Sequence, residues 1–176
     1  MAIRPWLLDR LRLALLLLVA VALQTAVFSR LTLLGVTADL FVILVVLVAV
    51  SRGPVTAAVF GFVAGLVADI VYLDPVGIHT LIYLVTGYVV ARYVEEFGLR
   101  SAWMVVVLTG LVSLAAQCVY GVFQFVIGPE GSFFYMVRAQ IIPAALLDGL
   151  LAAPLYMGLV RLHALPEPGA AEPSFR

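Results

Sequence analysis

The sequence contains no lysine, one cysteine and two histidines, and it carries few charges of either sign. Charged residues make up 11% of the 176 residues, against about 25% in a typical soluble domain. Cys118 lies in an apolar run, so a disulfide framework and a cysteine-rich metal site are excluded. His79 and His163 stand too far apart in the sequence to predict a zinc pair. Ten arginines balance ten acidic residues and the pI is near 6.7, so nothing indicates a nucleic-acid partner.

The motifs of common catalytic sites are also missing. The sequence has no G-x-S-x-G, no H-E-x-x-H and no glycine-lysine phosphate loop, and neither histidine is paired with a candidate nucleophile. A membrane protease needs such a pair or a cluster of metal ligands. We therefore predict a protein that is not an enzyme and that uses no metal or cofactor.

Apolar residues are abundant instead: they make up 65% of the chain, and the mean hydropathy is +1.19. A soluble fold of this length exposes too much of its surface to hide so much apolar area, so we predict an integral membrane protein. Turn-forming residues divide the chain into six apolar runs, each expected to be a transmembrane helix. The predicted architecture is an all-α polytopic membrane protein with one domain over residues 1–165, a disordered tail over 166–176, and spans at about 11–28, 37–50, 55–73, 78–94, 102–127 and 141–160.

The arginines predict the orientation of these spans. With six spans and a cytoplasmic N-terminus, eight of the ten arginines fall on the cytoplasmic side, and only Arg30 and Arg138 fall outside. This matches the usual excess of positive charge in cytoplasmic loops, so both termini are expected in the cytoplasm. Two segments have a further interpretation. Cleavage of a signal peptide near residues 20–22 is the alternative to a first span, and the aromatic residues of 132–140 predict a segment lying in the membrane interface.

Small residues recur every four positions in the third run, at Ala57, Gly61 and Gly65, and Asp69 continues the series. Residues at this spacing share one helix face, and a GxxxG pair lets another backbone approach closely in lipid. One interpretation is packing within the bundle, and the other is a docking surface for a partner helix.

Three aspartates, Asp39, Asp69 and Asp148, fall toward the outer side of the predicted bundle. Asp69 and Asp148 lie inside apolar runs, where a carboxylate faces protein or a water-filled cavity. A structural hydrogen bond or an ion pair, for instance between Asp148 and Arg138, is one interpretation. The alternative is a polar pocket open to the outside. The fifth run adds a semi-polar stripe of Thr109, Ser113, Gln117 and Gln124, which interhelical hydrogen bonds explain.

One combination of residues extends over nearly the whole chain before the proline-rich tail. It consists of Gln24, Asp39-Leu40, the block from Gly61 to Asp69, Gly77, Leu81, Tyr83, Gly87-Tyr88 and the run from Leu146 to Tyr156. Its most specific part is the G-F-x-x-G-L-x-x-D block. This combination resembles the bacterial rod shape-determining protein family MreD. The sequence departs from the family pattern at Ala38, where a proline is common, and over 129–140.

The resemblance implies a multi-pass protein of the bacterial cytoplasmic membrane that takes part in cell elongation. Family members work with MreC, a single-span protein with a large outer domain, and with the filament protein MreB. Through them they are linked to the RodA polymerase and a class B penicillin-binding protein in peptidoglycan synthesis. The family is also similar in fold to the S-components of energy-coupling-factor transporters, a likeness that does not by itself give function.

Three functional hypotheses follow. The first is a membrane scaffold that controls cell shape and holds the membrane helix of MreC, with Ala57, Gly61 and Gly65 as the docking surface. The second is a small-molecule or lipid-binding module of the S-component kind, with the polar pocket at Asp39, Asp69 and Asp148. The third is an ion-coupled transporter, which requires helix breaks in matching halves of the chain. The glycine and proline breaks of this sequence fall at the ends of the predicted helices instead.

Overall fold

The computed structural model describes residues 5–28, 35–73, 75–98, 101–127, 133–162 and 165, and these residues are almost entirely helical. The predicted all-α fold is therefore confirmed for this part of the chain. The helices are α1 (Pro5–Leu23), η1 (Gln24–Phe28), α2 (Leu40–Ser51), α3 (Pro54–Tyr72), α4 (Ile78–Phe97), α5 (Ala102–Ile127), α6 (Phe133–Met136), η2 (Val137–Ile141) and α7 (Ile142–Arg161). The segments η1 and η2 are π-helical turns.

Within the described residues, three helices are long and apolar enough to cross a membrane: Pro54–Tyr72, Trp103–Val126 and Phe134–Arg161. The helix α2 is more apolar than these helices but only 12 residues long, which corresponds to about 18 Å at 1.5 Å per residue. That length is well short of the ~30 Å hydrocarbon core of a bilayer. The predicted span 37–50 therefore corresponds to a helix that is too short to cross the core by itself.

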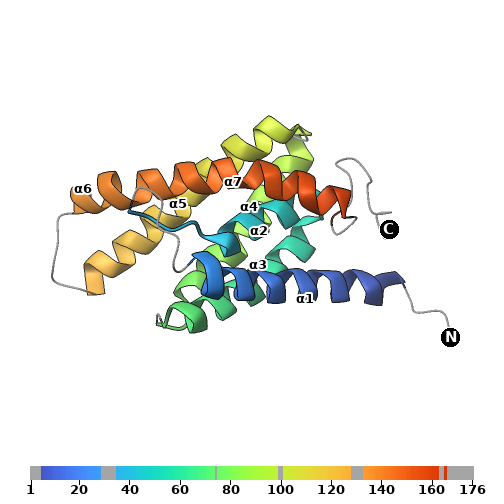
Figure 1. The fold of residues 1–176 in the computed structure, drawn as a ribbon, viewed down its shortest axis with the longest axis horizontal. Coiled ribbons are helices and arrows are strands. Elements are labelled where there is room, and N and C mark those ends of the chain that lie inside the picture. The colour runs from blue at the N-terminus through green and yellow to red at the C-terminus, as the bar shows by residue number, and fades with distance from the viewer. Residues whose placement is uncertain are drawn as a thin grey trace.

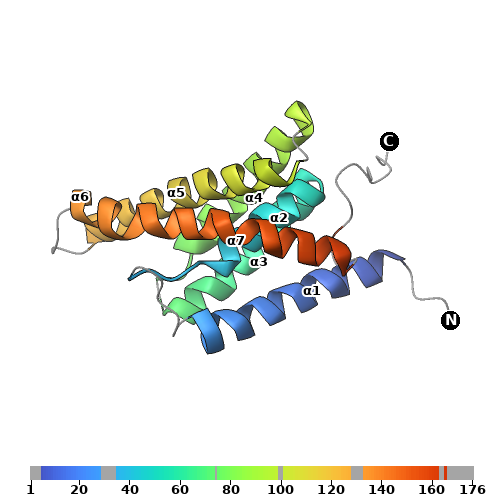
Figure 2. The same ribbon diagram turned by 45° about the horizontal axis from the view of Figure 1, so that its top comes forward.

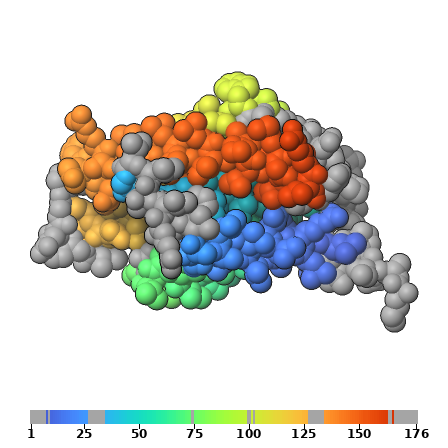
Figure 3. Space-filling view, in the orientation of Figure 1, coloured from blue at the N-terminus to red at the C-terminus, as the bar shows by residue number. Residues whose placement is uncertain are grey.

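The long helices run back and forth along the molecule, with the start of α1 and the end of α7 at the same end (Figure 1). α3 packs chiefly on α4, and α5 packs chiefly on α7. α2 lies between these two pairs and contacts both of them (Figure 2). In the space-filling view, α7 and α1 form two bands across one face, and little of α2 shows between them (Figure 3).

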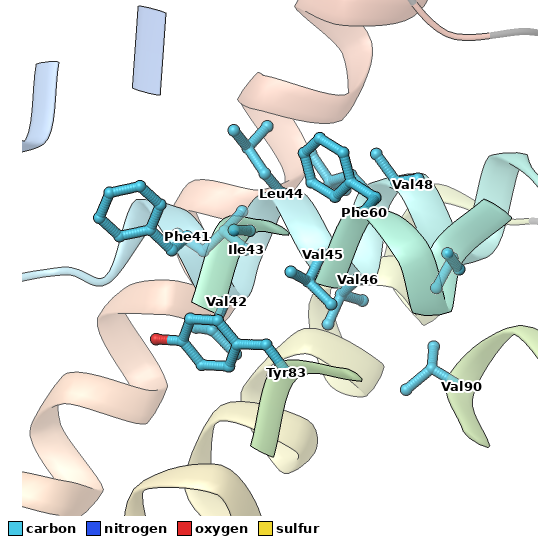
Figure 4. Close-up of a cluster of buried hydrophobic side chains, with 14 of the residues drawn as sticks. Phe41, Val42, Ile43, Leu44, Val45, Val46, Val48, Phe60, Tyr83 and Val90 are labelled. Atoms are coloured by element: carbon cyan, nitrogen blue, oxygen red, sulfur yellow. The ribbon is translucent and has the colours of Figure 1, made fainter. Parts of the chain in front are cut away.

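The hydrophobic core is built around α2. Every residue from Leu40 to Val50 is buried, because the helix is apolar on all sides and is enclosed by α3, α4, α5 and α7. Phe60 from α3, and Tyr83 and Val90 from α4, close around it (Figure 4). The protein therefore forms its interior by surrounding one short helix with longer ones.

The segment 133–140, predicted to lie in the membrane interface, is helical and continues directly into the last helix. Residues 134–161 form one helix of 28 residues, with a π-helical turn at Val137–Ile141. In this turn the N–H of Ile142 donates to the carbonyl of Val137. Pro143 follows, has no N–H to donate and would crowd the carbonyl of a regular preceding turn. The wider π-turn lets the helix continue through this position.

Candidate functional site

The face formed by Ala57, Gly61 and Gly65 lies against α4. A Cβ atom added at Gly65 would come within 2.5 Å of the carbonyl oxygen of His79, and one added at Gly61 would overlap the backbone of Tyr83. Gly87 on α4 approaches the backbone of Ala57 in the same way. The contacts are thus those of packing within the bundle. Docking of a partner helix on these three residues stays a prediction, and it requires α4 to move away.

Asp69, near the end of α3, caps the N-terminus of α4. Its carboxylate accepts hydrogen bonds from the backbone N–H groups of Gly77 (2.8 Å), His79 (2.9 Å) and Thr80 (3.3 Å) and from the Thr80 hydroxyl (2.7 Å). The Nδ1 atom of His79 lies 3.0 Å from the same carboxylate. The first N–H groups of a helix have no partner within it, and a negative charge at this end is favourable for the helix dipole. Both oxygens of the fully buried Asp69 carboxylate therefore have hydrogen-bond partners.

The N-terminus of α2 is capped by side chains from several helices. Asp39 accepts hydrogen bonds from the N–H groups of Phe41 and Val42. Gln24 accepts from the N–H of Leu40 and donates to the carbonyl of Ala38, both at 3.0 Å. Backbone groups that lose water inside a membrane protein must find partners within the protein, and here η1 supplies one of them through Gln24.

Asp148 brings α7 into the same cap. It accepts a hydrogen bond from the backbone N–H of Asp39 (2.9 Å), which is 109 residues away in the sequence. It also accepts from the Ser113 hydroxyl and from Gln117 Nε2 (3.2 Å) on α5. The alternative partner considered for it, Arg138, is exposed and lies ten residues earlier on the same helix, a rise of about 15 Å. The described residues show no ion pair between them.

Tyrosines and a histidine surround the carboxylates. The hydroxyls of Tyr83 and Tyr72 both donate to Asp39. The ring of His79 lies 4.5 Å from that of Tyr120 and 5.5 Å from those of Tyr72 and Tyr83, measured between centroids. This arrangement links Asp69 on one side to Asp39 and Asp148 on the other. The structure thus brings the three predicted aspartates into one polar cluster, together with aromatic residues that were not predicted to belong to it.

A small cavity of about 30 Å³ opens into this cluster, and its polar lining comes from Asp39, His79, Tyr83, Gln117 and Tyr120. A water molecule needs roughly 10–15 Å³ of such space, so the cavity has room for about two waters. Pockets for vitamin-sized ligands are about 300–1,000 Å³. In the described residues, no group of three or more His, Cys, Asp and Glu side chains is arranged to hold a metal ion. The cluster is therefore a network of hydrogen bonds in which carboxylates accept from backbone N–H, hydroxyl and amide donors.

The remaining members of the semi-polar stripe on α5 are not all in this cluster. Ser113 and Gln117 belong to it through Asp148. Gln124 is exposed and donates to the Tyr120 hydroxyl at 2.5 Å. The hydroxyl of Thr109 is fully buried and has no hydrogen-bond partner among the described residues. The spacing of these residues therefore identified the polar face of α5, but it did not show which of the polar side chains on that face contact α7.

The comparisons with known proteins agree with the resemblance found in the sequence. A family model described as rod shape-determining protein MreD matches residues 6–164. Searches among curated proteins and among solved structures gave no significant match. The family match includes every helix from α2 to α7 and all residues of the polar cluster.

Proposed function

The chain belongs to the MreD family of rod shape-determining proteins, and we propose that it works as a non-enzymatic membrane scaffold in cell elongation. Membership gives the role in rod shape determination, and the family is one of structural proteins. The scaffold role is supported by the part of the chain that the structure describes, in which the core residues are closely packed and the cavity at the polar cluster has a volume of only about 30 Å³. A protein built in this way acts through its surface rather than through an enclosed site.

The partner we propose is the single membrane helix of an MreC-like protein in the bacterial cytoplasmic membrane. Through that partner the chain would influence an MreB-like filament, a RodA-like polymerase and a class B penicillin-binding protein. The large exposed apolar side chains of α5, from Trp103 to Val126, support contact with a helix in lipid. They extend along nearly the whole of this 26-residue helix.

We propose the groove between α4 and α5 as the position of the partner helix. The groove has a volume of about 350 Å³ and contains no charged residue. Ala115 and Ala116 lie in it beside Val85 and Val89, and small residues let a second helix approach closely. A helix in this groove leaves the tight packing of α3 on α4 intact, whereas one on Ala57, Gly61 and Gly65 would have to displace α4.

Co-purification from membranes tests this proposal. The full chain carrying Ala115→Trp, which fills the groove, is expected to recover at least fivefold less of the MreC-like protein than the unmodified chain. The matched control is Leu150→Trp, which places the same side chain at an exposed position of α7. It is expected to recover the partner normally.

The elution volume of each variant in detergent shows whether it is folded. Normal recovery with folded Ala115→Trp would rule out the groove. Failure of the unmodified chain to recover the partner from cross-linked membranes would rule out the scaffold function as proposed.

A further inference from the structure

A second groove, between α1 and α3, differs from the first because a charged residue lies in it. Its volume is about 440 Å³, and its walls include Leu13 and Leu17 from α1 and Val59 and Val63 from α3. Arg10 lines the same groove. The groove is therefore apolar over most of its length and cationic at one position.

The cationic position is at one end of the groove. Arg10 precedes Leu13 and Leu17 along α1, and Thr56 precedes Val59 and Val63 along α3. Both helices start at the same end of the molecule (Figure 1). This is also the end where α3 begins, after the N-cap residue Gly53. Gly53 provides no side-chain cap, so the first N–H groups of α3 add to the positive potential there.

The length of the groove corresponds to one leaflet of a bilayer. From Val55 to Val63 the rise along α3 is about 12 Å, while half of the hydrocarbon core is about 15 Å. A transmembrane helix needs an apolar surface along the full thickness of the core. A lipid acyl chain with its headgroup at the interface needs only one half of it.

We propose that this groove binds an anionic phospholipid, with the headgroup phosphate at Arg10 and an acyl chain between α1 and α3. The charge of Arg10 complements the phosphate, and an arginine pairs well with phosphate oxygens because its N–H groups form a planar fork. The apolar walls exclude a free anion as the occupant. The groove shares no lining residue with the cavity of the polar cluster or with the groove proposed for the partner helix.

Native mass spectrometry of the full chain in detergent tests the proposal. The protein is titrated with phosphatidylglycerol and with phosphatidylcholine of identical acyl chains. We expect a preference for phosphatidylglycerol that Arg10→Gln lowers about fivefold, because a basic residue at a membrane surface contributes about 1 kcal/mol to attraction of anionic lipid. The matched control is Arg161→Gln, an exposed arginine on the last turn of α7, which should keep the preference.

A second variant tests the acyl-chain contact separately from the charge. Val59 is 60% exposed, so Val59→Trp fills the groove without disturbing the core, and it should reduce the binding of both lipids. Equal binding of both lipids by the unmodified chain would overturn the proposal, as would equal losses in Arg10→Gln and Arg161→Gln. A cross-link from Val59→Cys, in a Cys118→Ser background, to a co-purified protein helix would assign the groove to a protein instead.

Discussion

Among single residues, Asp69 has the most demanding role, because one carboxylate accepts hydrogen bonds from three backbone N–H groups and one hydroxyl. An asparagine has one acceptor oxygen and an NH₂ group that would face these donors. Asp69→Asn should therefore leave at least one buried N–H without an acceptor, at a cost of about 1–3 kcal/mol. We expect its thermal unfolding temperature in detergent to fall by several degrees.

Glu96→Gln is the control for this substitution. It makes the same chemical change at an exposed position near the end of α4, and it should leave the unfolding temperature unchanged. If Asp69→Asn unfolds at the same temperature as the unmodified chain, the capping role assigned to Asp69 is wrong. If Asp69→Asn and Asp148→Asn also preserve rod shape in cells, the polar cluster has no part in function.

At the scale of helices, the contact of α3 with α4 depends on glycine at positions where no Cβ atom fits. Gly65→Ala would place a methyl group against the backbone of His79 and Thr80, so we expect a loss of about 1–3 kcal/mol from overpacking. Gly158→Ala in α7 is the matched control, because its Cβ would meet no atom within 4 Å. That change should stabilise the helix by up to about 1 kcal/mol.

Chemical or thermal unfolding in one detergent compares the two variants directly. A Gly65→Ala protein as stable as Gly158→Ala would mean that α3 and α4 do not pack this closely in the membrane. Such a result would also make the face of Ala57, Gly61 and Gly65 available again for a partner helix.

The positions of the helices could be predicted from the sequence because apolar runs and turn residues are local signals. The fifth predicted run, 102–127, has the same bounds as α5, and the third and fourth differ from α3 and α4 by at most three residues. The start of the second predicted run, 37–50, is less accurate, because residues 37–39 precede the helix and Asp39 is its N-cap. The sequence pattern does not distinguish the N-cap residue from the first residue of the helix when the apolar run is too short to cross a membrane.

The contacts of the candidate site could not be predicted to the same extent. Asp148 and Asp39 are 109 residues apart, and no local pattern indicates which helices meet. The four-residue spacing of small residues identified the face of α3 that packs against another helix. The same spacing is compatible with a partner helix or with α4, so it could not show which of the two packs there. Neither Tyr83 nor His79 was predicted to belong to the polar cluster. Both lie close to Thr80 in the first two turns of α4, the helix whose N-terminus Asp69 caps.

For the whole molecule, the arginine distribution predicts a cytoplasmic location for the ends of α4 and α7 and an outer location for the turn before α4. Single-cysteine labelling tests this in a Cys118→Ala background. An impermeant maleimide added to intact spheroplasts should label Val76→Cys, which lies in that turn. It should label Ser101→Cys, before α5, only after the membrane is opened.

The reverse labelling pattern would mean that the orientation is inverted. Labelling of both positions from the same side would show that α4 does not cross the bilayer. The second outcome would contradict the six-span arrangement, whereas the first would retain it and change only its direction.

The capping of α2 has a consequence for how the protein is made. α2 leaves the ribosome early, but the carboxylate that binds the N–H of Asp39 belongs to the last helix. Until α7 is inserted, this buried helix end has one backbone donor without its native acceptor, and the core around α2 is open on one side. Biogenesis can therefore be completed only when translation of the membrane domain is complete, and chains truncated before Asp148 are expected to be substrates for membrane proteases.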